Sequence, residues 1–520
     1  MSDRPNFLFI ITDQQRADHL SAAGHPILKT PAIDSIAARG AMFERFYVAT
    51  PICMPNRSTL MTGRMPSVHG VRHNGIPLSL GAATFVDALR EAGYRTGLVG
   101  KSHLQNMVGE APMIPGAELR PAHSVAPGRY DQEDCKKWRN DARFDVEHPF
   151  YGFETVDFCN EHADYTEGHY TWWLRERHPD PDSLRGPANA IPTPDYVCPQ
   201  AWRTRVPEEL YSTSYVAERT IARLSEAART PGKPFFLQCS FPDPHHPWTP
   251  PGKYWGMHSP ADIPLPPDWQ IDRAKMPPHV QWLLDRRDDG SAVKTTQALF
   301  AVNEREAREA TALTFDMIRM IDDAVGRILG ALQSLGLERN TIVVFTADHA
   351  DYMGSHQIML KGPIHYQSLV RVPFIWCDPL APASGRRGGL ASTLDIAPTI
   401  LARAGVPAYH GIQGLSLLPV VRGEKAQLRD ALVIEEEGQR VYLGFKGRIK
   451  TRTLLTERHR LSVYAGADWG ELYDLADDPY ELDNLHADPA RRGLRGELHE
   501  RLAMEMLALA DPNPAPTGRA

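Results

Sequence analysis

The chain has 520 residues, of which 42% are hydrophobic and 23% charged, and its formal net charge is −7. These values are typical of a globular protein long enough for a main domain and a smaller companion. An acidic chain without a basic run argues against a nucleic-acid partner, and no apolar stretch reaches membrane-spanning length, so no membrane association is expected.

The N-terminus and the cysteines indicate the compartment. The chain runs from Met1 directly into the apolar segment Phe7–Ile11, which is too short for the core of a signal peptide. The six cysteines are scattered and show no paired metal-binding spacing. Free thiols in a reducing compartment fit this pattern better than a disulfide framework, so we expect a cytoplasmic protein.

Short β-branched and aromatic runs alternate with capped helices through roughly the first 430 residues. The expected strands are Phe7–Thr12, Thr96–Val99, Phe235–Ser240, Ile342–Thr346 and Pro373–Trp376. The expected helices run from Thr30-Pro31 to Gly40, from Thr84 to Gly93, and from about Glu304 to Leu335. Near-continuous apolar strands separated by helices predict an α/β fold whose mostly parallel sheet is covered on both faces.

One segment in this region has the pattern of a reactive site. Residues 52–64 read Ile-Cys-Met-Pro-Asn-Arg-Ser-Thr-Leu-Met-Thr-Gly-Arg, which places Cys53 at the start of a short helix that ends at Thr62-Gly63. A cysteine there faces free backbone N–H groups and the positive end of the helix dipole. Arg57, about one helical turn further on, can donate two parallel hydrogen bonds to an oxyanion. This arrangement suits chemistry on a phosphate- or sulfate-like ester; the alternative is a buried cysteine before a capped helix.

Two regions depart from the alternating pattern. Residues 105–205 are rich in Pro, Trp, His and charge, and we interpret them as an insertion that shapes the entrance to the site. Further on, the expected strands Ala431–Ile434, Arg440–Phe445 and Arg460–Tyr464, with 471–475 and a terminal helix, indicate a small α+β subdomain with an antiparallel sheet. We therefore divide the chain into a catalytic domain at 1–430, this subdomain at 431–510 and a flexible tail at 511–520.

Polar side chains follow four of the expected strands where each strand ends. They are Asp13-Gln14, Lys101 with His103, His245-His246, and Asp348-His349. Ligands of open α/β sheets bind beyond the carboxyl ends of the strands, so these clusters should converge on one edge. The side chains of Asp13, Gln14, Asp348 and His349 suit a divalent cation with positions left open for substrate. Taken alone, each cluster has the alternative of a solvated strand end or a turn.

Together these motifs resemble the sulfatase family. The pattern C-x-P-x-R-x-x-x-x-T-G-R at 53–64 is similar to the signature at which a formylglycine-generating enzyme converts the cysteine, here Cys53, to formylglycine, an aldehyde. Further landmarks in the same order are Gly100-Lys101-Ser102-His103, Pro244-His245-His246-Pro247, Thr346–His349, Lys361, Arg371–Pro373 and Leu472–Leu475. The resemblance spans residues 6 to about 485 without the segment 105–205. It implies an alkaline-phosphatase-like α/β/α sandwich, a metal-assisted hydrolase, and a homo-oligomer, either a dimer or a tetramer.

Some positions distinguish branches of the family. Many arylsulfatases hold calcium with paired aspartates and Asp-Asn, whereas Gln14 and His349 here resemble phosphonate monoester hydrolases and choline-sulfatase-like members. An imidazole ligand extends the candidate metals from Ca²⁺ to Mn²⁺ and Zn²⁺. Asn74 fits a substrate-contacting asparagine of the phosphonate branch, with a turn residue before Gly75 as the alternative. Conversely, Lys101 and His103 match the sulfatase Gly-Lys-x-His element.

The resemblance implies roles for these residues. Hydrated formylglycine attacks sulfur or phosphorus in line, steered by Asp348. The metal, Arg57, Lys101 and Lys361 neutralise the oxygens on which charge accumulates. His245 protonates the leaving alcohol, and His103 takes a proton from the second hydroxyl. The expected substrate is a small-molecule sulfate monoester; the alternatives are a phosphonate monoester or phosphodiester, or a non-catalytic protein that binds an oxyanion or a metal.

Overall fold

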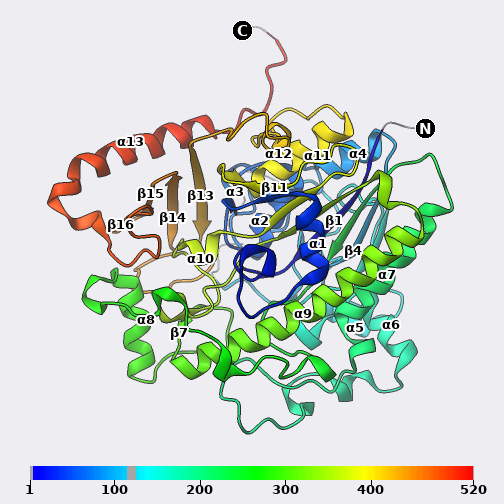
Figure 1. Ribbon diagram of the computed structural model, residues 1–520, viewed down its shortest axis with the longest axis horizontal. Coiled ribbons are helices and arrows are strands. Elements are labelled where there is room, and N and C mark those ends of the chain that lie inside the picture. Colours follow the sequence, from blue (N-terminus) through cyan, green and yellow to red (C-terminus); the bar gives the residue numbers. More distant parts are fainter. Residues whose placement is uncertain (1–3, 114–124, 519–520) are drawn as a thin grey trace.

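The computed structural model describes residues 4–113 and 125–518. Residues 1–3, residues 114–124 of the predicted insertion and residues 519–520 of the predicted tail lie outside this part. A large sheet with helices on both faces forms the body, and a smaller sheet crossed by helix α13 (Arg492–Ala508) lies to one side (Figure 1). Within the described ranges, no helix is both long and apolar enough to cross a membrane.

The large sheet has eight strands in the order β11-β2-β10-β8-β1-β6-β4-β5. Strands β8, β1, β6, β4 and β5 are mutually parallel, whereas β10 is antiparallel to both of its neighbours. The predicted mostly parallel sheet is therefore confirmed. The strands are β1 (Asn6–Thr12), β2 (Ala41–Phe43), β4 (Arg95–Gly100), β5 (Thr155–Phe158), β6 (Phe235–Ser240), β8 (Thr341–Ala347), β10 (Phe374–Cys377) and β11 (Gly385–Arg387).

Strand β1, at the centre, is buried on both faces because alternate side chains enter two hydrophobic cores. Phe7, Phe9 and Ile11 join one core, and Leu8 and Ile10 join the other. Helices from the two faces close these cores (Figure 1). On the first face they are α2 (Cys53–Thr62), α4 (Phe85–Glu91) and α11 (Ile396–Ala404); on the second they are α1 (Pro31–Arg39), α7 (Ser212–Ala228) and α9 (Glu304–Ser334).

The predicted helices are present, with ends shifted by one or two residues. Helix α9 begins with a capping box between Asn303 and Glu306, and the Thr84 side chain accepts the N–H of Asp87 at the start of α4. Helix α2 ends at Gly63, whose φ of 62° is left-handed, a conformation that glycine adopts without steric cost.

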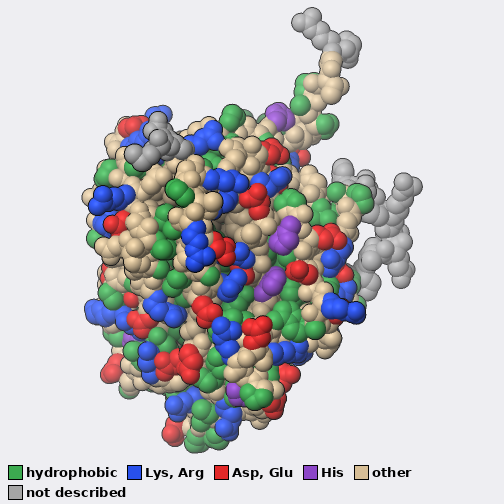
Figure 2. Space-filling model, turned by 90° about the vertical axis from the view of Figure 1, so that its right-hand side faces the viewer, with side chains coloured by type: hydrophobic (Ala, Val, Ile, Leu, Met, Phe, Trp, Pro, Cys, Tyr) green, Lys and Arg blue, Asp and Glu red, His purple; other side chains and the backbone are tan. Residues whose placement is uncertain are grey.

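The segment 105–205 belongs partly to the large sheet. It contributes the edge strand β5, which pairs with β4, and the short helices α5 (Cys135–Asn140) and α6 (His169–Arg177). On the face of the molecule shown in Figure 2, basic and acidic side chains are interspersed and form no stripe of one sign.

The second sheet is antiparallel and consists of β13 (Ala431–Glu437), β14 (Lys450–Thr456), β15 (His459–Tyr464) and β16 (Gly470–Asp474), packed against α13 (Arg492–Ala508). The predicted strand Arg440–Phe445 is wrong, and Lys450–Thr456 takes its place. Leu443 and Gly444 have φ values of 59° and 78°, which no strand accommodates. The apolar residues Tyr442 and Phe445 pack instead as a loop against the main core.

Candidate active site

The polar clusters that follow β1, β4, β6 and β8 meet around the start of α2. These strands are neighbours in the sheet, so their carboxyl ends open on one edge. Ligand atoms of Asp13, Cys53, His245 and His349 all lie within 4.8 Å of one another, and all four residues are buried.

Cys53 is the first residue of α2, and its Sγ lies 3.0 Å from His349 Nε2. Burial by itself raises the pKa of the thiol, but the positive charges of Lys361 and His349 leave that pKa below its ordinary value. The next backbone N–H, of Met54, donates to Asn74 Oδ1 at 3.1 Å. Asn74 therefore satisfies a free N–H group at the start of the helix and also lines the cleft above it.

Arg57 connects two buried carboxylates. Its Nε donates to Asp348 Oδ2 at 2.7 Å, and its Nη2 lies 3.4 Å from Asp13 Oδ2. Its Nη1 donates to the Lys101 carbonyl and to Ser240 Oγ, each at 3.0 Å. The guanidinium thus faces the protein's own oxygens, and a direct contact with substrate stays a prediction.

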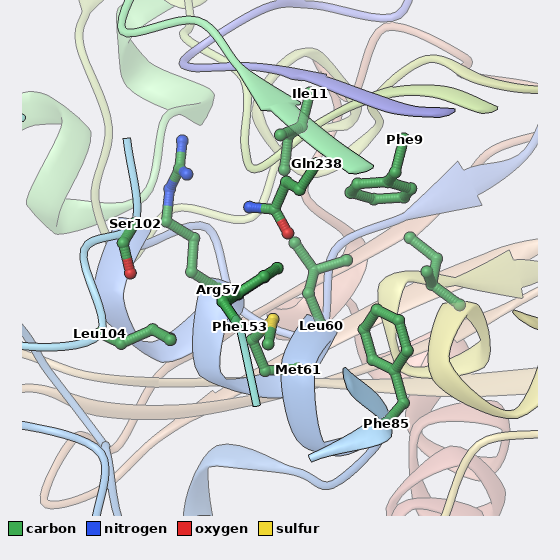
Figure 3. Close-up of a pocket in the computed structure, with 11 residues that line it drawn as sticks. Phe9, Ile11, Arg57, Leu60, Met61, Phe85, Ser102, Leu104, Phe153 and Gln238 are labelled. Atoms are coloured by element: carbon green, nitrogen blue, oxygen red, sulfur yellow. The ribbon is translucent and has the colours of Figure 1, made fainter. Parts of the chain in front are cut away.

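Behind Arg57 lies a small cavity of about 10 Å³, lined mostly by apolar side chains. Figure 3 shows Arg57 with Ser102 on one side and Gln238 on the other. Because this wall is apolar, the charge of Arg57 is balanced almost wholly by Asp348 and Asp13.

The two lysines have different partners. Lys101 Nζ donates to Asp13 Oδ2 at 2.5 Å and lies 2.6 Å from His162 Nε2. Lys361 Nζ lies 2.7 Å from His245 Nε2 and 3.1 Å from His349 Nε2. Burial raises the pKa of Asp13, but Lys101 and the neighbouring imidazoles hold that pKa well below its usual range.

Asp13 and His349 have the arrangement expected of metal ligands. Asp13 Oδ1 is buried and accepts no aligned hydrogen bond from the described residues, although His349 Nε2 lies 3.3 Å away. His349 Nδ1 donates to the Ala350 carbonyl at 2.9 Å, which directs Nε2 toward Asp13, as is usual for metal-binding histidines. Burial lowers the pKa of His349, but Asp348 and Asp13 raise it to about 10, so without a metal the imidazole supplies positive charge there.

Gln14 has a left-handed backbone, with φ at 64°, which turns the chain sharply after β1. Its Nε2 donates to Asp351 Oδ2 at 2.6 Å, and its Oε1 accepts from Lys361 at 3.3 Å. Nε2 is thereby directed away from the cluster and Oε1 toward it. The carbonyl oxygen is the atom of this side chain that can bind a cation.

His103 and His245 border the same cleft. His103 also has a left-handed backbone, at φ 60°, and its backbone N–H donates to Glu133 at 2.6 Å. Its Nδ1 is buried without a hydrogen-bond partner among the described residues. His245 Nδ1 donates to the His246 carbonyl, so its Nε2 carries the lone pair that faces Lys361.

His162 was not predicted from the sequence. This residue lies in the segment 105–205, which matched no motif, yet its ring stacks on that of His245 with centroids 3.6 Å apart. The signal that was available is its place just after β5, because a polar pair after a strand marked the other clusters too.

Cys53 and His245 of this cluster, with His103, His162 and Lys361, line a cleft of about 490 Å³. Its walls come from the start of α2 and from residues 73–75, 106–113 and 161–162. The end of β13 and the loop after it, which includes the segment expected as a strand, complete the walls. This volume is sufficient for a small organic ester.

The chain matches two family models and several known proteins along most of its length. The family model described as Sulfatase matches residues 5–406, and that described as N-sulphoglucosamine sulphohydrolase, C-terminal, matches residues 354–507. An arylsulfatase of Clostridium perfringens is 27% identical over 493 residues, which cover 93% of this chain and 90% of that protein. A choline-sulfatase of Rhizobium meliloti is 25% identical, over 94% of this chain and 83% of its own length.

Among solved structures, the phosphonate monoester hydrolase of Agrobacterium radiobacter superposes with a TM-score of 0.77 at 27% identity, over 98% of this chain and 97% of the other. A 2-O GAG sulfatase superposes with a TM-score of 0.68 at 24% identity, over 100% and 95% of the two chains, a likeness of fold.

Proposed function

Because this chain belongs to the sulfatase family, whose model matches residues 5–406, we propose that it cleaves sulfate monoesters with a formylglycine formed from Cys53. Hydrolysis of sulfate esters is the chemistry of that family. The observation that supports the finer proposal is the place of Cys53. It is buried at a helix start on the floor of the cleft, among ligand atoms within 4.8 Å of one another.

The ligand set supports a divalent cation. Asp13, Gln14, Asp348 and His349 would hold it, and the chemistry that it supplies is to acidify the attacking hydroxyl and neutralise the transferred sulfuryl group. Arg57 holds Asp13 and Asp348 in place. Oxygen and imidazole ligands together leave Ca²⁺, Mn²⁺ and Zn²⁺ as candidates.

The chain's own groups account for the remaining steps. One hydroxyl of the hydrated aldehyde at 53 releases its proton to solvent and attacks sulfur while the bond from sulfur to the leaving oxygen breaks. The ammonium groups of Lys101 and Lys361 stabilise the sulfuryl oxygens. The leaving oxygen takes a proton from the Lys361–His245 pair, and His103 Nδ1 accepts the proton of the second hydroxyl. The carbonyl then re-forms, and the bond from carbon to the sulfate oxygen breaks.

Mass spectrometry and kinetics together test this proposal. After co-expression with a formylglycine-generating enzyme, the peptide that contains Cys53 should be about 18 Da lighter, because an aldehyde replaces the thiol. Cys53→Ala should abolish hydrolysis of 4-nitrophenyl sulfate, whereas Cys377→Ala, on β10, should leave it unchanged. An unmodified thiol in an active enzyme, or full activity in Cys53→Ala, would contradict the proposal.

A phosphonate monoester or phosphodiester hydrolase with the same nucleophile is the second candidate. Gln14 and His349 favour it, as does the likeness to the Agrobacterium radiobacter structure at 27% identity. Parallel kcat/KM values for 4-nitrophenyl sulfate and 4-nitrophenyl phenylphosphonate decide between the two, and a clearly higher value for the phosphonate would reverse our order.

We infer further that the protein is cytoplasmic and forms a dimer or tetramer. The six cysteines all lie in the described part of the chain and form no disulfide there, which supports a reducing compartment. Size-exclusion chromatography with light scattering measures the oligomeric state directly.

A further inference from the structure

Two lysine–histidine pairs lie side by side in the active site. Lys361 contacts His245 Nε2 at 2.7 Å, and Lys101 contacts His162 Nε2 at 2.6 Å. The two imidazole rings stack on each other, with centroids 3.6 Å apart and planes 21° apart. The mechanism above gives roles to both lysines and to His245 but none to His162.

The neighbour of His162 fixes its tautomer. His162 Nδ1 lies 3.1 Å from Glu161 Oε2. Burial raises the pKa of Glu161, but His162 more than offsets this and holds it below its ordinary value, so the carboxylate accepts. Nδ1 therefore carries the hydrogen, and the Nε2 lone pair accepts from the Lys101 ammonium.

The loop that carries this pair is held in an uncommon conformation. Glu161 and Ala163, on either side of His162, have left-handed φ values of 72° and 55°. Asn160 and Glu167 close the loop with two backbone hydrogen bonds of 2.9 Å, and Asn160 Oδ1 accepts the N–H of Ser102 at 3.3 Å. Left-handed non-glycine residues persist where the surroundings over-determine them, and they cluster at functional sites.

Among the described residues, two groups accept hydrogen bonds from the Lys101 ammonium, which leaves its third N–H without a partner there. An ammonium group has three N–H donors, and Asp13 Oδ2 at 2.5 Å and His162 Nε2 at 2.6 Å take two of them. A lysine on a flexible stem is thereby fixed, with its third N–H left for an anionic oxygen of the substrate.

We propose that Glu161 and His162 are positioning residues that aim the Lys101 ammonium at the sulfuryl oxygens. Glu161 orients the imidazole of His162, and this imidazole orients the Lys101 ammonium. Stacking on His245 holds the two histidine rings in a fixed position relative to each other. This inference rests on the proposed function, because the oxygens that Lys101 meets are those of the ester.

Kinetics of single variants form the first test. His162→Ala should lower kcat/KM for 4-nitrophenyl sulfate about 10²-fold, mainly through kcat, because a misplaced group loses transition-state contacts. His162→Gln should recover part of the loss, since its amide oxygen can accept from Lys101, and Glu161→Gln should cause a smaller loss. The matched controls Glu176→Gln and His178→Gln, in the same segment but outside the cleft, should behave like the wild type.

A double-mutant cycle separates positioning from general structural damage. If His162 acts through Lys101, adding His162→Ala to Lys101→Ala should cause almost no further loss. A double variant whose loss in kcat/KM equals the product of the two single losses would overturn the inference. So would a loss below about 3-fold in His162→Ala with an unchanged melting temperature.

A binding measurement keeps this test independent of turnover. Calorimetric titration of the metal-loaded protein with inorganic sulfate should show weaker binding in His162→Ala and in Lys101→Ala, but not in the two controls. If the wild type hydrolyses neither ester but binds sulfate in this His162-dependent way, the proposed function fails and the positioning role stands. Equal sulfate affinity in wild type and His162→Ala would count against the positioning role, whatever the turnover.

Discussion

Replacing Arg57 with glutamine removes the guanidinium that joins the two carboxylates of the site. The distance is 2.7 Å to Asp348 and 3.4 Å to Asp13, and the three side chains are at most 3% exposed. Removing one partner of a buried ion pair costs about 3–5 kcal/mol, because the remaining charge is left uncompensated. Unfolding entropies of about 2.1 cal/mol/K per residue convert this to a midpoint lower by about 3–5 °C for 520 residues.

Differential scanning calorimetry in chelator and in excess Ca²⁺, Mn²⁺ or Zn²⁺ provides the assay. The drop should be largest in chelator, since a divalent cation held by Asp13 and Asp348 would supply part of the missing positive charge. Arg501→Gln, which breaks an exposed ion pair with Asp430, should shift the midpoint by less than about 1 °C. An Arg57→Gln midpoint equal to that of the wild type in chelator, or the same drop with and without metal, would refute this account of the site.

Two further predictions concern the elements around the site. A Cβ at Gly100 would lie 1.8 Å from the Ser240 carbonyl oxygen, so Gly100→Ala should lower the unfolding midpoint by about 3–5 °C and reduce turnover. Gly93 is also left-handed, but a Cβ there would meet no atom within 4 Å, so Gly93→Ala should lower the midpoint by only about 1–2 °C. Calorimetry of both variants checks this, and equal shifts would contradict it. Burial lowers the pKa of His69 to about 3, and its Nδ1 accepts the Val71 N–H, so the native imidazole is neutral. The stability that the neutral His69 contributes is fully present above the ordinary pKa of about 6.5 and is lost as pH falls toward 3, with about 2 kcal/mol lost by pH 5. Between pH 7 and pH 5, the unfolding midpoint of His69→Asn should therefore fall about 2 °C less than that of the wild type. The same pH dependence in both proteins would contradict this prediction.

Much of the fold was predictable because its signals are local. The apolar run of β1, the capping residues of α4 and the amphipathic pattern of α9 are each local features of the sequence, and these elements lie where expected. The strand Arg440–Phe445 failed for the same reason. Its Val, Tyr and Phe residues are typical of a strand, but the left-handed Leu443 and Gly444 bend the segment into a loop. Nothing in that window states that Phe445 packs from a loop onto the rings of Tyr464 and Trp469.

By itself, the sequence determined that a cysteine lies at the start of a helix in a sulfatase-like motif. The residues of that motif lie within about a dozen positions of one another, so their spacing is visible in the sequence. Tertiary structure alone decided which groups share protons and charge. In the folded protein Arg57 contacts Asp348 and Asp13, and His162 contacts Lys101, which is 61 positions away in the sequence. Such contacts depend on the order of the strands in the sheet and on how the loops close. Neither can be read from the residues next to each position in the sequence.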